Sequence, residues 1–488
     1  MLLNKQDGLH QAGLLETDSK TLFSFNGEDM RDHYADLWSL SSYTSTIGMI
    51  EDPLLGRVWD FTEKLMSTFG RQDIPEGWRE INHSELGLDG SVMDSSGYYS
   101  GLSGLASMDG QVRIFGKFDG GEKPTDITVA FRGTNGLRDV AAYIENLDGF
   151  EERNGYSYVN SFDYVLNAVK DYALANGLTG SDVSVTGYSL GGAAVNDMYG
   201  QRETSWDGFY ESSLYFGNAP CFVKGGEGIL NFGFENDTVH RAWLDGEGVV
   251  PALKHALKNQ DPEFDSSTDN MVLFSDVYAH GLHAPLGAFS WFDPLSWEAH
   301  IGAAAMNPIE IIGRSNFYDE MSEDSRVVIS NLLDSTQGST WVWDKDSPST
   351  KNADRSEGFV LGTDSRDLIR DRAESNDFLD GFDGDDLFKI SGGNDVVHGG
   401  AGHDKVKMSG RLDDYHIERS EDGTVYLYDK SGKNGLNTLI DVEEISFRPF
   451  LFEQSYDITE GGLVGSSFWS FNSERSWDTS VLETYQVI

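Results

Sequence analysis

Apolar and polar residues follow three different patterns along the chain. Between residues 125 and 235, short β-branched and aromatic runs alternate with a stretch of helical spacing, apolar at positions 158, 162, 165, 169 and 172. The runs predict strands at 127–134, 183–186, 214–217 and 228–234. One helix is expected to end at Gly177 and another to begin at Ala193. Strands that alternate with helices predict an α/β fold.

The second pattern has a period of nine residues and lies near the C-terminus. Aspartates stand at 377, 386, 395 and 404, and Asp367 fits the series with a slip of one residue. Two residues after each aspartate comes an apolar residue: Ile369, Leu379, Phe388, Val397 and Val406. The last unit, 399–406, follows the calcium-binding nonapeptide G-G-x-G-x-D-x-U-x. This register predicts a parallel β-roll whose apolar positions point inward.

Calcium suits this repeat because a hard cation takes about six to eight oxygen ligands, and glycine turns expose carbonyls beside each aspartate. The expected ligands are Asp377, Gly381, Asp383, Asp386, Gly393, Asp395, Gly399, Gly402 and Asp404. An acidic, glycine-rich linker is the alternative, but a linker has no reason to keep a nine-residue register. Arg372, Ala373 and Ser375 replace glycines, so the first units are expected to be caps that bind calcium poorly.

The third pattern separates and follows the repeat. The polar segment 343–354 reads as a linker and predicts a catalytic domain over 1–350 and a C-terminal domain over 351–488, with the calcium repeats at 362–406. Polar and apolar residues alternate over 411–452, which predicts short β-strands. The amphipathic segment 49–61 is interpreted either as a lid or as a core helix.

The strand at 183–186 runs directly into G-x-S-x-G at 187–191, and a helix follows. Strand, sharp turn and helix in this order form the nucleophile elbow of α/β-hydrolases, which presents Ser189 at the carboxyl edge of the sheet. Glycines are needed because side chains would clash in the strained turn. A surface turn serine is the alternative.

A nucleophilic serine needs an acid and a histidine, which follow it in this fold. Asp237 lies just past the strand at 228–234 and is favoured over Glu235, although a solvated turn aspartate is the alternative. The pattern leaves His280, His283 and His300 open as the base.

The oxyanion hole needs the N–H of the residue after the nucleophile, Leu190, and a second N–H from an earlier strand end. Thr134, at the tip of the strand 127–134, is the candidate, with an ordinary strand-to-loop turn as the alternative.

Composition narrows the function classes further. The formal net charge of −45 argues against nucleic acid and against a polybasic membrane patch. Residues 362–406 contribute only −6 of it, so calcium ligands do not explain the acidity. A content of 39% hydrophobic residues argues against disorder, and the single cysteine, Cys221, excludes an intrachain disulfide. The first twenty residues lack the pattern of a cleaved signal peptide.

Five motifs in fixed order resemble the repeats-in-toxin lipases of Gram-negative bacteria. They are F-R-G-T-x-G at 131–136, G-x-S-L-G-G at 187–192, G-F-E-N-D at 233–237, S-T-D-N at 267–270 and F-Y-D-E-M-x-x-D-S at 317–325. The resemblance covers roughly 125–410. One departure is Tyr188, where the family usually has histidine.

The resemblance implies a secreted triacylglycerol lipase that attacks esters at an oil–water interface. It implies Ser189 as nucleophile, Asp237 as acid and His300, in W-x-x-H, as base. It also implies a calcium ion held by Asp269 and Asp324, a monomer, and release by a type I exporter that reads a signal near 453–488. The alternatives are a phospholipase A1 or polyester hydrolase with the same triad, and a calcium-dependent adhesin without catalysis.

Overall fold

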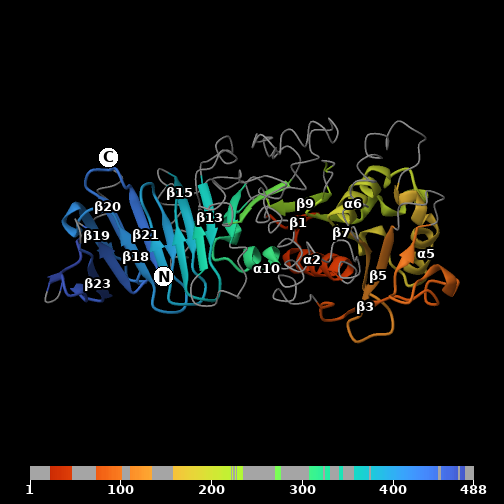
Figure 1. Ribbon diagram of the computed structural model, residues 1–488, viewed down its shortest axis with the longest axis horizontal. Coiled ribbons are helices and arrows are strands. Elements are labelled where there is room, and N and C mark those ends of the chain that lie inside the picture. Colours follow the sequence, from red (N-terminus) through yellow and green to blue (C-terminus); the bar gives the residue numbers. More distant parts are fainter. Residues whose placement is uncertain are drawn as a thin grey trace, which may run out of the picture. The chain divides into compact units, whose positions relative to one another are not determined.

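The chain divides into two compact units in the computed structural model (Figure 1). The α/β unit comprises Phe23–Val272 and Gly281–Glu310, and the β-rich unit comprises Met1–Leu22, Leu273–His280 and Ile311–Ile488. The residues that the structure describes are 22–46, 73–101, 110–133, 158–220, 223, 226, 228–234, 270–275, 307–321, 325–329, 340–343, 357–372, 375–448, 452–470 and 473–478.

The α/β unit is built on a sheet with the strand order β9-β8-β7-β6-β5-β3, and β4 pairs with β5. The strands from β6 to β9 run parallel, whereas β5 is antiparallel to β6 and to β3. Their bounds are β3 Trp78–Glu80, β4 Tyr99–Ser100, β5 Gln111–Lys117, β6 Asp126–Phe131, β7 Val183–Tyr188, β8 Leu214–Asn218 and β9 Ile229–Phe234. All four strands predicted for this region are therefore confirmed.

Helices cover both faces of this sheet. α5 (Asp163–Ala175) and α6 (Leu190–Gln201) share one core cluster with Val129 and Phe131. Leu40, on α2 (Arg31–Thr46), packs instead with Phe115 and Ala130. Because neighbouring residues of a strand point to opposite faces, α2 covers the face opposite α5 and α6.

The helix expected to end at Gly177 is α5. Gly177 takes φ +85°, and the N–H of Leu178 donates to the carbonyl of Ala173 at 2.9 Å, the closure of a left-handed helix end. The second helix, α6, begins at Leu190, three residues before the position expected from the apolar pattern.

In the β-rich unit, successive strands from β11 to β18 alternate between two sheets and pair in parallel with the strand two places along, and β17 and β18 then pair in parallel with β21 and β22. The first sheet contains β11, β13, β15, β17 and β21, and the second contains β12, β14, β16, β18 and β22. Their bounds are β11 Arg326–Ile329, β12 Thr340–Trp343, β13 Glu357–Leu361, β14 Asp367–Arg370, β15 Asn376–Asp380, β16 Leu387–Lys389, β17 Val396–His398, β18 Lys405–Met408, β21 Leu436–Ile440 and β22 Glu444–Phe447.

The predicted inward positions of the nine-residue repeat are all buried. Ile369, Leu379, Phe388, Val397 and Val406 each expose 0% of their surface. Each of the nine-residue units therefore adds one strand to one sheet and one apolar side chain to a narrow core.

Antiparallel strands extend both sheets toward the C-terminus. β20 (Val425–Asp429) and β19 (Tyr415–Arg419) follow β21 in the first sheet. β23 (Gln454–Thr459), β24 (Gly462–Gly465) and β25 (Glu474–Arg475) follow β22 in the second. The strands expected over 411–452 are confirmed, whereas the domain boundary at 350 stays a prediction.

The further short strands and helix are β1 (Ser24–Phe25), β2 (Glu28–Asp29), β10 (Asn270–Ser275) and α10 (Pro308–Gly313), and short 3-10 helices occur between the elements. None of the helices in the described ranges is long and apolar enough to span a membrane.

Candidate active site and repeat region

Ser189 is the single residue between β7 and α6, and its backbone is strained. Its φ of 56° and ψ of −114° fall outside the regions that a residue with a side chain ordinarily occupies. The N–H of Ser189 donates to the carbonyl of Asn218 at 2.8 Å, and its carbonyl accepts the N–H of Ala193 at 3.1 Å. These two bonds hold the turn, so the strain belongs to a fixed feature of the fold.

Glycines make this turn sterically possible. A Cβ atom added to Gly187 would overlap the backbone carbonyl of Gly191, and one added to Gly191 would overlap the carbonyl of Phe131. β7 therefore approaches α6 closely, and α6 approaches the end of β6, only because no side chain intervenes. Ser189 itself is 7% exposed. This is the geometry expected of a nucleophile elbow.

The end of β6 lies beside the elbow. Phe131 pairs with Gly187 in the parallel ladder, and the N–H of Gly133 donates to Ser45 Oγ at 3.1 Å. A Cβ atom on Gly133 would stand 2.9 Å from the carbonyl of Tyr188. Leu190, the first residue of α6, belongs to the first turn, whose N–H groups have no partner within the helix and favour negative charge.

Several predicted site residues lie outside the described residues. These are Thr134, Asp237 with its alternative Glu235, His300 with its alternatives His280 and His283, the calcium ligands Asp269 and Asp324, and the segment 49–61. Gly133 and Phe234 are the described residues that precede two of them, at the ends of β6 and β9. The carboxyl ends of parallel strands meet at one edge of a sheet, which is also the edge that carries Ser189.

A buried amide pair, not anticipated from the sequence, joins α6 to β9. Asn196 Nδ2 donates to Asn231 Oδ1 at 2.7 Å, and Asn231 Nδ2 donates to Asn196 Oδ1 at 3.0 Å. Both residues expose 0% of their surface. The pair ties the elbow helix to the strand that leads toward Asp237. A polar residue in the apolar run Ile229–Phe234 was the available signal.

The repeat aspartates form ladders across successive coils. The N–H of Asp367 donates to Asp386 Oδ1 at 2.7 Å, and the N–H of Asp386 donates to Asp404 Oδ1 at 2.8 Å. In the first sheet, the N–H of Asp377 donates to Asp395 Oδ1 at 3.0 Å. Each ladder ends on a residue outside the repeat, because the N–H of Asp404 donates to Glu443 Oε2 at 2.7 Å and the N–H of Asp395 donates to Asn437 Oδ1 at 3.2 Å.

The second carboxylate oxygen distinguishes Asp386 and Asp404 from Asp367. Oδ2 of Asp386 and of Asp404 is buried and has no hydrogen-bond partner. By contrast, Asp367 Oδ2 accepts the N–H of Thr363 at 2.5 Å. A buried anionic oxygen without a partner is costly, so the coils of Asp386 and Asp404 suit a cation better than the coil of Asp367 does.

Carbonyl oxygens converge on the same places. A Cβ atom on Gly381 would contact both Asp386 Oδ2 and the carbonyl of Gly399, and one on Gly399 would contact Asp404 Oδ2 and the carbonyl of Asp441. Among the described residues no group of three or more His, Cys, Asp or Glu side chains forms a metal site by itself. A cation here would therefore take backbone carbonyls together with one carboxylate, the oxygen set that calcium prefers.

The electrostatics of these carboxyl groups point the same way. Burial, with neighbouring aspartates, raises the pKa of Asp386 to about 9 and raises that of Asp395 well above its usual range. Burial also raises the pKa of Asp404 to about 6, although a backbone hydrogen bond opposes the rise. Without a cation, ionising these groups is unfavourable.

The remaining predicted ligands occupy the turns. Gly393 and Gly402 take φ of +128° and +148° and pack on the carbonyls of Ser375 and Gly384, where no Cβ atom would fit. Asp383 is exposed and forms an isolated parallel bridge with Ala401. Phe382 takes φ +65° at a glycine position of the repeat, a strained conformation for an aromatic residue.

Comparison with known proteins gives relatives of one kind. No protein-family model matches the chain. A lipase of Pseudomonas fluorescens is 35% identical over 300 residues, which cover 59% of this chain and 60% of that protein. A second lipase of Pseudomonas fluorescens is 33% identical over 297 residues, which cover 59% of this chain and 64% of the relative. The matched segments thus span about three fifths of the length of these curated relatives.

Among solved structures, the crystal structure of the extracellular lipase LipA from Serratia marcescens is similar, with a TM-score of 0.74 and 27% sequence identity. The match covers 94% of this chain and 79% of that one. An α/β unit followed by a C-terminal β-rich region is thus an architecture that this chain shares with a bacterial lipase.

Proposed function

We propose that this protein is a secreted lipase, a carboxylic ester hydrolase that acts through an acyl-enzyme. The strained Ser189 at the end of a central parallel strand carries the proposal, because such an elbow exposes a nucleophile above the sheet edge. The likeness to lipases from two bacteria supports the same activity and supports secretion.

In the proposed reaction, His300 takes the proton of Ser189 as the serine oxygen attacks the ester carbonyl. Asp237 orients the imidazole and stabilises its charged form. The N–H groups of Leu190 and Thr134 stabilise the oxyanion, and loss of the alcohol leaves an acyl-serine. A water molecule activated by His300 then releases the fatty acid and restores Ser189.

A fluorophosphonate probe tests the proposal because it labels only an activated serine. Ser184 is a matched control, since it lies on the same strand and its Oγ is 2.8 Å from His33 Nε2, a serine–histidine pair without an elbow. Ser189→Ala is expected to abolish labelling, and Ser184→Ala to retain it. Full labelling of the Ser189→Ala protein would refute the assignment and favour the non-catalytic adhesin.

The substrate class is a separate part of the proposal. Triacylglycerol is the expected substrate, and the alternatives are phospholipids, attacked as by a phospholipase A1, and polyesters. Initial rates on triolein, phosphatidylcholine and a short-chain ester at equal interfacial area separate them. A rate on phosphatidylcholine above that on triolein would reverse the preference.

We further propose that the repeat region binds calcium. Asp386 and Asp404 would hold it with carbonyls of the glycine turns, and Asp395 would serve the other sheet. Asp269 and Asp324 are the expected ligands of a separate site. Bound calcium would neutralise the buried carboxylates and so stabilise the coils. Equilibrium dialysis with ⁴⁵Ca checks this, and a protein that binds no calcium would refute it.

Release by a type I exporter is the remaining part of the proposal. The predicted signal region, about 453–488, contains β23 and β24, which pair with β22 and with each other. Deleting the whole region would therefore damage the fold as well. Truncation after Asp478 keeps these strands, so retention of that variant inside cells expressing the exporter would support a signal in the last residues, and normal export would exclude it.

A further inference from the structure

Three basic residues stand in register on adjacent strands of the second sheet. Arg370 pairs with Lys389, and Lys389 pairs with Lys407, on β14, β16 and β18. Each directly follows a buried inward residue (Ile369, Phe388 or Val406), or lies beside one, so all three point to the outer face. On β22 the residue in register with Lys407 is Ser446, and Arg448 lies two residues further along the chain. We call Arg370, Lys389, Lys407 and Arg448 the cation ladder.

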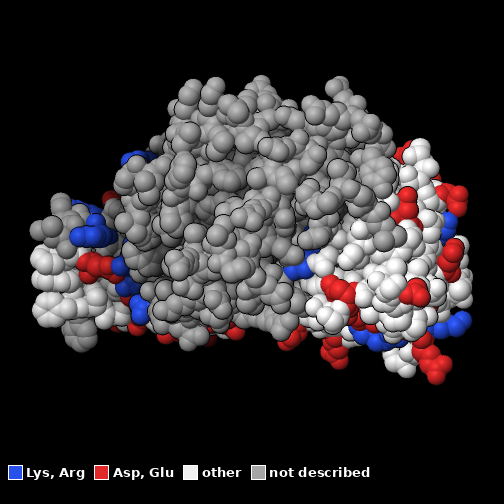
Figure 2. All heavy atoms as spheres, turned by 45° about the vertical axis from the view of Figure 1, so that its right-hand side comes forward, with Lys and Arg blue, Asp and Glu red and all other residues white. Residues whose placement is uncertain are grey.

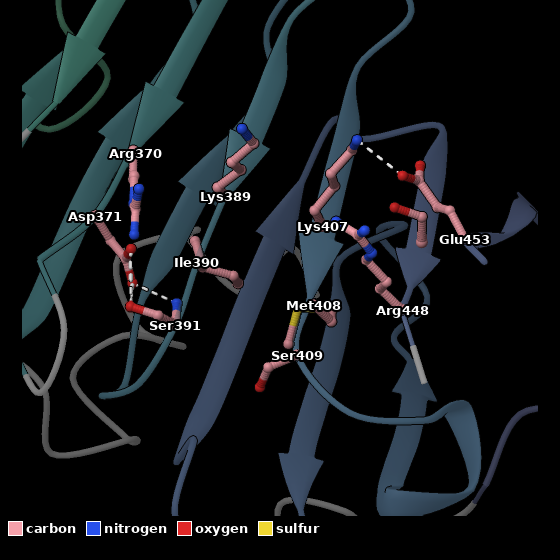
Figure 3. Close-up of a pocket in the computed structure, with 11 residues that line it drawn as sticks. Arg370, Asp371, Lys389, Ile390, Ser391, Lys407, Met408, Ser409, Arg448 and Glu453 are labelled. Atoms are coloured by element: carbon pink, nitrogen blue, oxygen red, sulfur yellow. Dashed lines mark hydrogen bonds and ion pairs between the residues drawn. The ribbon is translucent and has the colours of Figure 1, made fainter. Parts of the chain in front are cut away.

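The cation ladder lines a pocket of about 380 Å³ (Figure 3). Lys389 lies between Arg370 and Lys407, and Arg448 lies next to Lys407. Ile390 and Met408 supply apolar wall, and Ser391, Ser409 and Ser446 supply hydroxyl groups. The pocket therefore combines several cations with neutral hydrogen-bond donors.

Two carboxylates in the pocket neutralise the ladder only in part. Glu453 accepts from Lys407 at 2.9 Å and from Lys405, which lies outside the pocket, at 2.7 Å. Asp371 accepts the hydroxyl of Ser391 at 3.0 Å and is buried. Within the described part of the chain, Lys389 and Arg448 have no ion pair. The residues that line the pocket include four basic side chains and two carboxylates, in a protein whose net charge is −45.

The equivalent row on the first sheet shows what an internally satisfied ladder looks like. There Asp380 and His398 stand on adjacent strands, with His398 Nδ1 3.7 Å from Asp380 Oδ1. The hydroxyl of Ser315 and the N–H of Asn316 also donate to Asp380, at 2.9 and 2.7 Å. That row places an imidazole beside a carboxylate, and the carboxylate also accepts hydrogen bonds from other parts of the chain. The cation ladder has like charges side by side.

Like charges placed directly opposite each other destabilise a sheet. Burial, followed by repulsion from Lys407 and Arg370, lowers the pKa of Lys389. Basic side chains, with acidic ones among them, are visible on the described surface of the β-rich unit at the left of Figure 2. An arrangement that costs stability is expected where a ligand supplies the missing charge.

We propose that this pocket binds a phosphoryl dianion, with Lys389, Lys407 and Arg448 as its principal partners. Adjacent parallel strands are about 4.8 Å apart, so one tetrahedral oxyanion can accept from two neighbouring cations of the row. The guanidinium of Arg448 offers paired donors, and Lys389 acts as a point charge. This site lies in the β-rich unit, is separate from Ser189, and goes beyond the proposed ester hydrolysis.

The phosphoryl group has two possible sources, free phosphate and a lipid headgroup. Phe452 precedes Glu453 in the chain, is 51% exposed and stacks on Trp469 with ring centroids 4.0 Å apart. Phe468 is 85% exposed and meets Trp469 edge to face. Exposed aromatic rings near a phosphate site are suited to a lipid–water interface.

The first experiment measures binding of inorganic phosphate to the full-length protein by isothermal titration calorimetry, at calcium concentrations below precipitation. Lys389→Gln and Arg448→Gln are each expected to weaken binding about tenfold, the loss of one charge-assisted hydrogen bond. Lys433→Gln changes an exposed lysine elsewhere in the same unit and is expected to have no effect. Equal affinity in all four proteins, or no binding, would overturn the proposal.

A second measurement guards against misfolded variants. Without phosphate, Lys389→Gln removes one like charge and is expected to leave the melting temperature unchanged or higher, while the increase caused by phosphate becomes smaller. A lower melting temperature together with an unchanged response to phosphate would show that Lys389 is structural only, and would also overturn the proposal.

Vesicle sedimentation separates the two sources. Vesicles of phosphatidylcholine with phosphatidic acid are compared with phosphatidylcholine alone, using the Phe468→Ser/Trp469→Ser variant. If binding requires phosphatidic acid in the vesicles, and both this variant and Lys389→Gln reduce it, the site is assigned to a lipid headgroup. Phosphate binding without vesicle binding would assign it to a soluble phosphoryl ligand.

Discussion

The buried polar groups near Ser189 and those of the nine-residue repeat, one set in each unit, differ in how they are satisfied. In the α/β unit, Asn196 and Asn231 satisfy each other across a helix and a strand, and one strained residue, Ser189, is held by neighbouring carbonyls and N–H groups. In the β-rich unit, Asp386 and Asp404 each keep one buried carboxylate oxygen without a partner. The asparagine pair thus has its partners within the protein, whereas the two aspartates each keep a carboxylate oxygen that no described group of the protein satisfies.

The difference shows two ways of placing chemistry on a scaffold. A nucleophile needs a single position held against strain, which a large mixed core can provide. A cation site needs oxygens repeated at a fixed spacing, which a coil of identical units provides. The predictions below either break this contrast or make it sharper.

The largest effect is expected from Ser189→Ala. Loss of the nucleophile should lower kcat on an ester substrate by about 10⁴-fold or more. The β-rich unit should keep its calcium-dependent stability, because Ser189 lies in the other unit. Steady-state kinetics and thermal unfolding with calcium measure the two properties on one sample. A residual rate within tenfold of wild type would remove Ser189 from the mechanism.

The second largest effect is expected from calcium removal, which should destabilise the β-rich unit and leave the α/β unit unchanged. Chelation is expected to raise amide hydrogen exchange throughout 375–408 while β5–β8 stay protected, because the buried carboxylate oxygens without a hydrogen bond that the described ranges contain all lie in the coils. Calcium at a thousand times the Kd of a site stabilises the folded state by about 4 kcal/mol, and chelation removes this stabilisation. Exchange that rises equally in both units would erase the contrast.

Gly191→Ala probes the elbow by packing alone. Because a Cβ atom there would overlap the carbonyl of Phe131, the substitution should cost about 2–4 kcal/mol of unfolding free energy and disturb Ser189. Gly121→Ala is the control in the same unit, since its nearest atoms are 3.9 Å away. Denaturant titration of both variants gives the difference. Similar values for the two would mean that the elbow relaxes freely.

The effect of Asp386→Asn on the free energy of unfolding should change sign when calcium is added. In calcium-free buffer the native pKa of Asp386, raised to about 9 from 3.8, means that the native state holds the proton more tightly than the unfolded state. Wild-type stability should therefore fall as the pH rises from about 4 to 9. Asparagine removes this fall and stabilises the metal-free coil, yet weakens it in calcium. Urea titrations at pH 5 and 8, with and without calcium, test both signs.

Glu453→Gln should give the smallest effect. Burial alone would raise the pKa of Glu453, but hydrogen bonds from Lys405 and Lys407 outweigh it and lower the pKa from 4.5 to about 2. The stability that Glu453 contributes is present above pH 4.5 and is lost toward pH 2. The difference between wild type and variant should shrink over that window. Exposed Glu421→Gln serves as the control, and a constant difference would contradict the assignment.

The features that the sequence predicted correctly are those that short-range patterns determine. The strand before Ser189, the helix that ends at Gly177 and the inward positions of the repeat all follow from short-range periodicity and turn chemistry. α6 begins at Leu190 instead of Ala193 because glycines at 191 and 192, which the apolar pattern cannot register, are already helical. The need for glycine at these two positions became clear only from the structure, in which neighbouring backbone atoms approach them closely.

Long-range pairing accounts for what the sequence did not reveal. β11 and β12 belong to the β-rich unit although they precede the polar segment, because they pair with β13 and β14. The cation ladder stayed hidden because its members lie 19, 18 and 41 residues apart in the sequence. The net charge of −45 is a sum over the whole chain, so it does not reveal basic residues that are distant in the sequence and that strand pairing brings together. For this reason the net charge argued against a local basic site.

The closing residues of the aspartate ladders bear on the timing of folding. The N–H of each ladder aspartate donates to a side-chain oxygen of a residue later in the chain, and the two ladders end on Asn437 and Glu443. A nascent chain that stops before these residues lacks the end of both ladders. Folding of the coil is therefore expected to start from its C-terminal end, after 425–447 has formed its strands, against the direction of synthesis. The repeat would thus stay open until its synthesis is complete.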